Sequence, residues 1–150
     1  MTDRNELCAL LPHAAPMCLL DALVSWDPES LVCTAVSHGD PHHPLRRNGR
    51  LAAVHAIEYA CQATALHAAL AARAAPDPAQ RSLLAAVKEI ALSQDYLDQI
   101  EPPLRISVWR ELALGPSAIY RFLVEGGGGA VASGRLTVVG GLGGRSELMW

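Results

Sequence analysis

The stretch AAVHAIEYACQATALHAAL, residues 52–70, reads as a helix made almost entirely of alanine and aliphatic residues. Ala and Leu are strong helix formers, and no Pro or Gly interrupts the run. Apolar residues occupy nearly every face, which is typical of a helix that is buried around most of its circumference. Its polar residues His55, Glu58 and Gln62 fall within a stripe of about 60° at 100° per residue. The sequence therefore predicts a central helix over residues 50–74, capped by Asn48, with one polar stripe.

Short apolar runs on both sides of this helix predict strands. Two lie before it and four after it: residues 17–26, 30–38, 82–93, 104–112, 117–126 and 130–140. Asp27-Pro28-Glu29 and the glycine run at 126–129 have the composition of hairpin turns. Residues 5–11 predict a short helix that ends at Pro12. This order of elements favours an α+β fold in which one helix lies on an antiparallel sheet.

A flat sheet would leave much of so apolar a helix uncovered. We therefore expect a curled antiparallel sheet wrapped around one long central helix, and pairing with a second copy as a homodimer. Residues 1–150 suit a single domain. The tail from about residue 141 is expected to be loose, since it begins with glycines.

Composition argues against several classes of function. A net charge of −3 disfavours nucleic acid as the main partner, because phosphate binding needs a basic surface. The apolar run at 51–72 contains two His, a Glu and a Gln, which favours a buried helix over a membrane span. The N-terminus lacks the pattern of a signal peptide, so we expect a cytoplasmic protein that does not contact the membrane.

Neither a metal, a cofactor nor a disulfide is expected. Three His lie within residues 38–43, but no HExxH motif and no Cys/His ligand spacing is present. The glycine run lacks the Lys-Ser/Thr of a phosphate loop, and no GxSxG motif marks a serine nucleophile. The cysteines show no CxxC spacing, and we expect all four to be reduced, buried thiols: Cys8, Cys18, Cys33 and Cys61.

The polar stripe on the helix has two interpretations. A carboxylic acid in apolar surroundings holds its proton more readily than in water and can act as a general acid or base. Under that interpretation Glu58 is catalytic. Alternatively, His55, Glu58 and Gln62 reach solvent or bond one another at spacings of three and four residues. Spacing alone leaves both open.

Two motifs together resemble a known family. Leu11-Pro12-His13, Pro16 and Leu19-Leu20-Asp21 look like the opening of the hot-dog-fold β-hydroxyacyl-acyl-carrier-protein dehydratases. The helix of that family carries Glu-Ala-Met-Ala-Gln, and EYACQA at 58–63 keeps its Glu and Gln in register. The similarity covers residues 8–140 and looks closest to a divergent branch of the kind found in aryl-polyene and fatty-acid-like pathways.

The resemblance implies a reaction and a set of site residues. A 3-hydroxyacyl chain on phosphopantetheine of an acyl carrier protein would enter a tunnel at the dimer interface and lose water to give a trans-2-enoyl thioester. Glu58 of one subunit and a His of the other would carry the chemistry. His42, in His42-His43-Pro44, matches the family His, with His43 as the alternative.

The same resemblance assigns substrate-binding and docking residues. Ala53 stands where the family has a glycine whose amide polarises the thioester, and His55 and Gln62 would line the tunnel. Arg46, Arg47 and Arg50 lie just before or at the start of the helix. They would meet the phosphopantetheine phosphate and the acidic carrier, or they belong to a solvated loop and point away from the helix amides.

Two other functions remain open on the same fold. One is hydrolysis of acyl thioesters, in which the helix carboxylate activates water. The other is a non-catalytic subunit that binds an acyl carrier or completes a heterodimer. The family's Gly after His and its Pro-Gly before the helix are absent here, which leaves room for the second.

Overall fold

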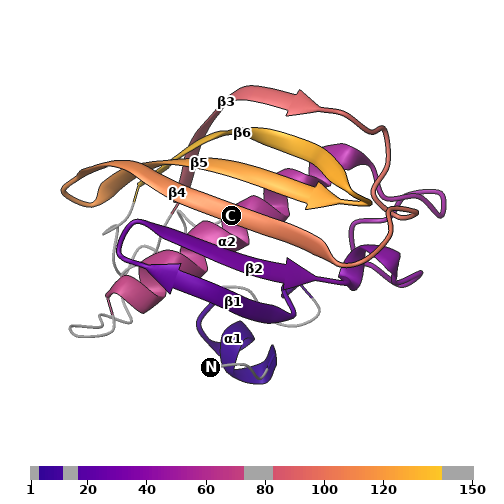
Figure 1. Ribbon diagram of the computed structural model, residues 1–150, viewed down its shortest axis with the longest axis horizontal. Coiled ribbons are helices and arrows are strands. Elements are labelled where there is room, and N and C mark those ends of the chain that lie inside the picture. The colour runs from indigo at the N-terminus through magenta and orange to yellow at the C-terminus, as the bar shows by residue number, and fades with distance from the viewer. Residues whose placement is uncertain (1–3, 12–16, 73–82, 140–150) are drawn as a thin grey trace.

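The computed structural model describes residues 4–11, 17–72 and 83–139, and it places one long helix across one face of a six-stranded antiparallel sheet (Figure 1). The strand order is β1-β2-β4-β5-β6-β3, so β1 and β3 form the two edges. The helices are α1 (Arg4–Ala9) and α2 (Ala56–Ala71), with 3-10 turns η1 (Ser37–Gly39) and η2 (Ala53–His55). The strands are β1 (Ala22–Asp27), β2 (Ser30–Ala35), β3 (Leu83–Leu92), β4 (Leu104–Leu114), β5 (Ser117–Gly126) and β6 (Gly129–Val139). This is the expected hot-dog arrangement, and the predicted fold class is confirmed.

The core lies between α2 and the four central strands, all of which α2 contacts. The inward residues of each strand alternate with outward ones, as period-2 patterning requires. On β4, for example, Leu104, Ile106 and Val108 are fully buried while Arg105 faces out. Burying one such aliphatic side chain stabilises the fold by about 1.5–3 kcal/mol. The alternation therefore fixes which face of the sheet receives the helix.

Both predicted hairpin turns are present. Asp27 Oδ1 accepts from the backbone N–H of Glu29 and of Ser30, which closes the β1–β2 turn at Pro28. Gly127 and Gly128 adopt positive φ values of 63° and 86° between β5 and β6, a conformation that glycine reaches at little cost.

The first strand is shorter than the sequence predicts. The prediction opens it at residue 17, but β1 begins at Ala22. The backbone of Met17 and Leu19 bonds the side chain of Gln62 on α2 instead of a neighbouring strand. Similarly, β2 ends at Ala35, because the chain turns into η1.

The central helix begins later than the sequence predicts. Asn48 does not cap it, and α2 starts at Ala56 after the turn η2. Asn48 and Gly49 have φ values of 54° and 76°, and Arg47 and Arg50 bond each other through N–H and C=O on both sides. Asn-Gly favours this tight reversal, so a small turn replaces the first helical residues.

The prediction of four reduced cysteines is wrong for two of them. Cys8 on α1 and Cys18 form a disulfide, with their Cα atoms 5.8 Å apart. Cys33 and Cys61 are free and buried, as expected. A separation of 10 residues without a motif carries no pairing signal. The bridge forms because α1 folds back against the start of β1, an arrangement visible in Figure 1.

The remaining predictions concern a membrane span and residues at the limits of the described ranges. Within the described ranges, no helix is long and apolar enough to cross a membrane. Pro12, His13 and Pro16 of the family motif lie outside the described residues. The tail from residue 141 also lies outside them.

Candidate functional site

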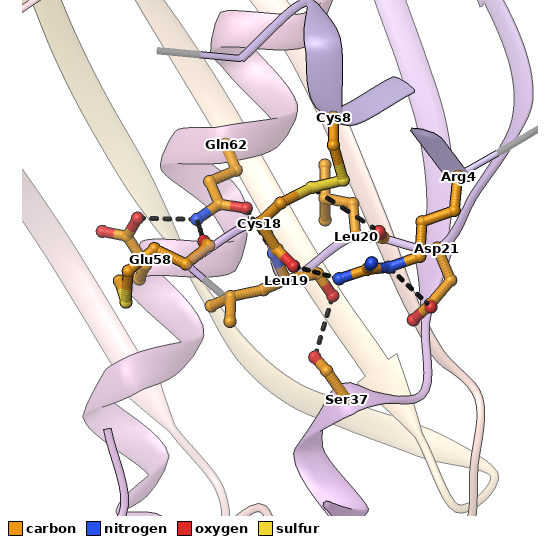
Figure 2. The surroundings of a disulfide bond; sticks show 10 residues. Arg4, Cys8, Cys18, Leu19, Leu20, Asp21, Ser37, Glu58 and Gln62 are labelled. Atoms are coloured by element: carbon orange, nitrogen blue, oxygen red, sulfur yellow. Dashed lines mark hydrogen bonds and ion pairs between the residues drawn. A yellow bond between two sulfur atoms is a disulfide. The ribbon is translucent and has the colours of Figure 1, made fainter. Parts of the chain in front are cut away.

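Glu58 stands in the first turn of α2, and Gln62 one turn later holds it by a hydrogen bond. Gln62 Nε2 donates to Glu58 Oε2 at 2.9 Å. The same amide donates to the carbonyl of Met17 at 2.6 Å, while its Oε1 accepts from the backbone N–H of Leu19 at 2.9 Å. Figure 2 shows the amide between the backbone of this segment and the Glu58 carboxylate. We call these three hydrogen bonds the Gln62 clamp.

The clamp fixes the orientation of the Gln62 amide. A backbone carbonyl can only accept and a backbone N–H can only donate, so the two ends of the amide are assigned without ambiguity. Gln62 is only 1% exposed, and an unpaired polar group there would cost about 1–3 kcal/mol. The second N–H of the amide is therefore directed at Glu58. Within the polar stripe, Glu58 and Gln62 therefore bond each other at a spacing of four residues, as the second interpretation expects. This contact is also compatible with a catalytic Glu58.

The Cys61 thiol, which senses the charge of Glu58, is unreactive. Burial raises the pKa of Cys61 to about 12, and the negative charge of Glu58 adds to this. Burial likewise raises the pKa of Cys33 to about 12. Thiolates are the reactive form of cysteine, so neither residue is a nucleophile at neutral pH.

A buried hydrogen-bonded chain runs from His43 to the segment that holds Gln62. His43 Nε2 lies 3.1 Å from the hydroxyl of Tyr59, which lies 2.7 Å from Ser37 Oγ. Ser37 donates in turn to the carbonyl of Leu19 at 2.8 Å. Since Leu19 also donates to Gln62, both polar systems meet at one residue.

Both ring nitrogens of His43 are engaged inside the protein. The backbone N–H of Leu45 donates to Nδ1 at 3.0 Å, so Nδ1 carries no proton and Nε2 must donate to Tyr59. Burial lowers the pKa of His43, and the nearby basic side chains of His55 and Arg46 lower it further. His43 is therefore a neutral, buried ring with no free lone pair. His42, by contrast, is exposed, and its backbone N–H donates to Asp40 Oδ1.

His55 precedes Glu58 by one turn of helix and is half-buried. Burial lowers its pKa, Arg47 lowers it further, and the charge of Glu58 opposes both. A neutral imidazole and a carboxylate thus share the first turn of the central helix. That pair lies at the N-terminal end of a mostly apolar helix.

A loop between β3 and β4 holds the start of the helix. The backbone of Leu97 donates to Leu51 O at 2.8 Å, and Ala53 N donates to Asp95 O at 2.9 Å. Asp98 accepts from Leu51 N through Oδ1 and from Arg50 Nε through Oδ2. Burial would raise the pKa of Asp98, but these hydrogen bonds outweigh it and hold the pKa below its usual value.

This loop has a consequence for Ala53. The resemblance gives its N–H the task of polarising the thioester, but that N–H already donates to the Asp95 carbonyl. The Ala53 N–H therefore has an acceptor within the protein, and its role at a thioester stays a prediction.

The three arginines before the helix differ in their surroundings. Arg46 donates to the carbonyls of Asp40, Gly49 and His38, so its guanidinium holds the loop together. Arg50 pairs with Asp98 and lies over the ring of Tyr96, 3.8 Å from its centroid. Arg47 is exposed and donates to the carbonyl of Arg46. Of the three side chains, that of Arg47 is the most available to a partner.

Tyr59 and Ser37 belong to the site but are not among the residues predicted from the sequence. Tyr59 is the single aromatic residue in the helix stretch, directly after Glu58, and this is an available signal. Burial raises the pKa of Tyr59 well above its usual value, so it stays protonated and serves as a hydrogen-bond relay. Among the described residues, no group of three or more His, Cys, Asp and Glu could hold a metal ion.

Comparison with known proteins identifies the family of this chain. The family model described as "ApeP-like: ApeP dehydratase" matches residues 5–142. The chain belongs to the ApeP-like dehydratase family. No curated protein matches it significantly.

Solved structures of low sequence identity share the fold. The dehydratase heterocomplex ApeI:P from Xenorhabdus doucetiae matches with a TM-score of 0.81 at 22% identity, over 95% of this chain and 93% of that one. A mutant of the thioesterase PA1618 from Pseudomonas aeruginosa matches with a TM-score of 0.65 at 16% identity, over 92% and 93%. A homologue of HP0420 from Helicobacter felis matches at 0.61 and 12%, over 87% and 84%. Dehydratases and thioesterases both use this architecture, so the family match decides between them.

Proposed function

We propose that this ApeP-like dehydratase removes water from 3-hydroxyacyl thioesters on acyl carrier protein and yields trans-2-enoyl thioesters. The family assignment supports dehydration, and aryl-polyene or fatty-acid-like biosynthesis is the proposed setting. The observation that carries the proposal is the Gln62 clamp, which holds Glu58 at the start of an apolar helix. A carboxylic acid fixed there can protonate a leaving hydroxyl while apolar side chains line a path for the acyl chain.

The chemistry needs one base and one acid. A neutral imidazole takes the proton from C2, electrons move to form the C2–C3 double bond, and the C3 hydroxyl leaves with a proton from Glu58 as water. We assign the base to His42 of the second subunit, because His42 is exposed while His43 is bonded at both ring nitrogens. His43 remains the alternative base that the sequence offers.

Negative charge develops on the thioester oxygen during C2 deprotonation. The first N–H groups of a helix lack intrahelical partners and can hold such charge. The sequence offers the Ala53 amide for this role, and because Ala53 N also donates to Asp95 O, we propose the next amide of η2, that of Val54, as its partner in the same role. His55 and Gln62 then stand beside the substrate without taking its protons.

Assembly and location follow from the reaction. We propose a dimer, which a shared His–Glu site requires, formed by two copies of this chain or by this chain and a related subunit. The structural match ApeI:P is itself a heterocomplex. A cytoplasmic location fits a partner acyl carrier protein, and no cofactor or metal is needed for the elimination.

Carrier docking is proposed at the arginines before the helix. The exposed Arg47 would meet the phosphopantetheine phosphate or the acidic carrier directly. Arg46 and Arg50 would shape that surface, since both hold loop backbone or Asp98.

The test is one assay with 3-hydroxyacyl carrier protein, followed by mass spectrometry of the acyl-carrier. Loss of one water from the carrier-bound chain is expected, and Glu58→Gln should slow it strongly. Release of a free hydroxy acid would instead identify a thioester hydrolase. An unchanged substrate that nevertheless binds the protein would identify a non-catalytic subunit, and either result would overturn the proposal.

A further inference from the structure

One cysteine of the disulfide lies between the two residues whose backbone the Gln62 clamp binds. Cys18 stands between Met17, whose carbonyl accepts from Gln62, and Leu19, whose N–H donates to it. The two backbone groups of the clamp are therefore the immediate neighbours of the bridged residue. Figure 2 shows the bridge from Cys8 reaching this segment on one side, with Gln62 and Glu58 on the other.

The disulfide adds a covalent link to a segment that has no strand partner. Met17 and Leu19 are not part of β1, which starts at Ala22. Beyond the clamp, this segment is held by the Ser37 hydroxyl on Leu19 O and by Arg4 on Cys18 O, at 2.8 and 2.6 Å. A disulfide confines such a segment in a way that single hydrogen bonds do not.

We propose that the Cys8–Cys18 disulfide is a redox-sensitive positioning device for Glu58, acting through the backbone of Met17 and Leu19 and the amide of Gln62. In the oxidised chain the segment is fixed and the clamp is closed. In the reduced chain the segment gains freedom, the Gln62 amide is less fixed, and Glu58 loses a defined position. The consequence for activity rests on the proposed dehydratase function, whereas the consequence for Gln62 does not.

Reduction should loosen this region without unfolding the chain. Arg4 also pairs with Asp21 at 3.3 Å, and Leu7 of α1 is fully buried in the core. Asp21 in turn accepts from the backbone N–H of Val36 at 2.7 Å. These contacts retain α1 when the covalent link is lost, so the effect is local.

The redox step is an ordinary thiol–disulfide exchange with a dithiol reductant. A thiolate of the reductant attacks the sulfur of Cys8, which is half-buried, and the sulfur of the buried Cys18 leaves and takes up a proton. The second thiol of the reductant then releases Cys8 as a thiol. Two electrons and two protons pass from the dithiol to the protein, and the reductant ends as a disulfide. The buried Cys33 and Cys61 do not compete, because burial raises the pKa of both thiols to about 12.

In a cytoplasmic enzyme, the Cys8–Cys18 disulfide would undergo this thiol–disulfide exchange. Reducing systems keep most cytoplasmic thiols reduced, and the disulfides found there are mainly transient or redox-sensing. A bridge that affects the position of a catalytic acid would link turnover to the thiol state of the cell.

The direct test reads Gln62 itself. The chain has four glutamines, so the side-chain NH₂ signals of ¹⁵N-labelled protein are few, and Gln62→Leu assigns the one of interest. In the oxidised protein the Gln62 NH₂ protons should exchange slowly with water. After treatment with dithiothreitol they should exchange at least about tenfold faster and shift. Identical Gln62 signals in both states would overturn the proposal.

The activity test uses the same two states and a variant that cannot form the bridge. A loss of about 10–100-fold in kcat with a nearly unchanged KM is expected on reduction, since small misplacements of a catalytic group cost rate more than binding. Cys8→Ser should match the reduced wild type and no longer respond to dithiothreitol. As a control, Arg4→Gln removes the ion pair with Asp21 and the hydrogen bond to Cys18 O but keeps the bridge, and its kcat should still respond to dithiothreitol.

Separate outcomes distinguish this proposal from the proposed function. Faster Gln62 exchange without dehydration in either state supports the positioning device and refutes the dehydratase. Equal kcat in both states of an active enzyme overturns the positioning device. So does loss of the far-ultraviolet helix signal on reduction, because the bridge would then support the whole fold.

Discussion

At the scale of single residues, Glu58 gives the sharpest prediction. Glu58→Gln keeps an oxygen that can accept from Gln62 Nε2, so the fold should be intact by circular dichroism. An amide cannot give a proton to a leaving hydroxyl, and turnover should fall about 10²–10⁴-fold. Single-turnover dehydration with saturating substrate measures this. A variant with wild-type turnover would reduce Glu58 to a structural residue.

The buried imidazoles predict how stability depends on pH. His67 donates to the carbonyl of Asp27 through Nε2 at 2.8 Å, so Nδ1 of the neutral ring accepts from the Tyr120 hydroxyl at 2.7 Å. Burial lowers the pKa of His67, opposed by the Asp27 carbonyl, and burial also lowers the pKa of His43. The unfolded chain therefore binds more protons as the pH falls below the ordinary value of 6.5.

Stability should then decrease from pH 6.5 downward, by at most about 1.4 kcal/mol per pH unit for each His, until the folded-state pKa is passed. Above pH 6.5 these two groups should contribute no further change. Urea unfolding at pH 7.5, 6.5 and 5.5 measures the slope. His67→Gln can keep both partners without titrating, so it should have a shallower slope, and an unchanged slope would exclude His67 as the cause.

The sequence identifies Glu58 and Gln62 because a polar pair in an alanine-rich helix is unusual and keeps a helical spacing. It does not identify their partners. Met17 and Leu19 contribute backbone groups, which any residue type carries, and they are more than 40 positions away along the chain. Tyr59 and Ser37 meet only because η1 packs against the helix.

At the scale of elements, the start of the helix gives a prediction about docking. Arg47 is exposed, whereas Arg46 binds three loop carbonyls. Arg47→Glu should raise KM for carrier-bound substrate and leave a short pantetheine thioester almost unaffected, because the latter lacks the carrier and the phosphate. The effect should weaken with salt, since the Debye length is about 8 Å at physiological ionic strength.

Arg46→Glu provides the contrast. It leaves the carbonyls of Asp40, Gly49 and His38 without a donor, so it should lower the melting temperature and impair both substrates alike. Steady-state kinetics with the two substrates separate the variants. Equal responses of both substrates to Arg47→Glu would mean that this side chain serves the loop alone.

Every strand and helix of the structure is predicted from the sequence, but several element ends are not. Alternating apolar residues identify strands wherever one face is buried, as on β2 and β4. The sequence places the start of α2 too early because Asn48 can serve as a helix cap or, with Gly49, as a tight turn. Packing against the loop that carries Asp98 favours the turn, and no local pattern encodes that loop's position.

At the scale of the whole molecule, the disulfide is the largest departure from the sequence-based expectation. Cys8 and Cys18 approach because Leu7 enters the core and Arg4 reaches Asp21, and these are tertiary contacts. Closing a loop of 10 residues removes freedom from the unfolded chain, and reduction should lower the free energy of unfolding by about 2–3 kcal/mol. Urea unfolding with and without dithiothreitol measures this, with Cys8→Ser as the reference that should show no difference.

The last prediction concerns assembly through the edge of the sheet. Strand β3 pairs with β6 on one side only within the described chain, and an exposed edge invites pairing with another strand. Two copies joined edge to edge would form a continuous sheet and elute at about 32 kDa, twice the 15.9 kDa of one chain. Ala85 and Ala91 on β3 are exposed in the single chain, so Ala85→Lys with Ala91→Lys would place like charges opposite each other at that edge.

This double variant should elute as a monomer and lose turnover, because the base and Glu58 come from different subunits. Val24→Lys tests the opposite edge, since Val24 is 51% exposed on β1, and it should leave both size and turnover unchanged. Sizing coupled to light scattering over a hundredfold dilution measures each species. An active monomer would refute the shared site, and dissociation by Val24→Lys alone would move the interface to β1.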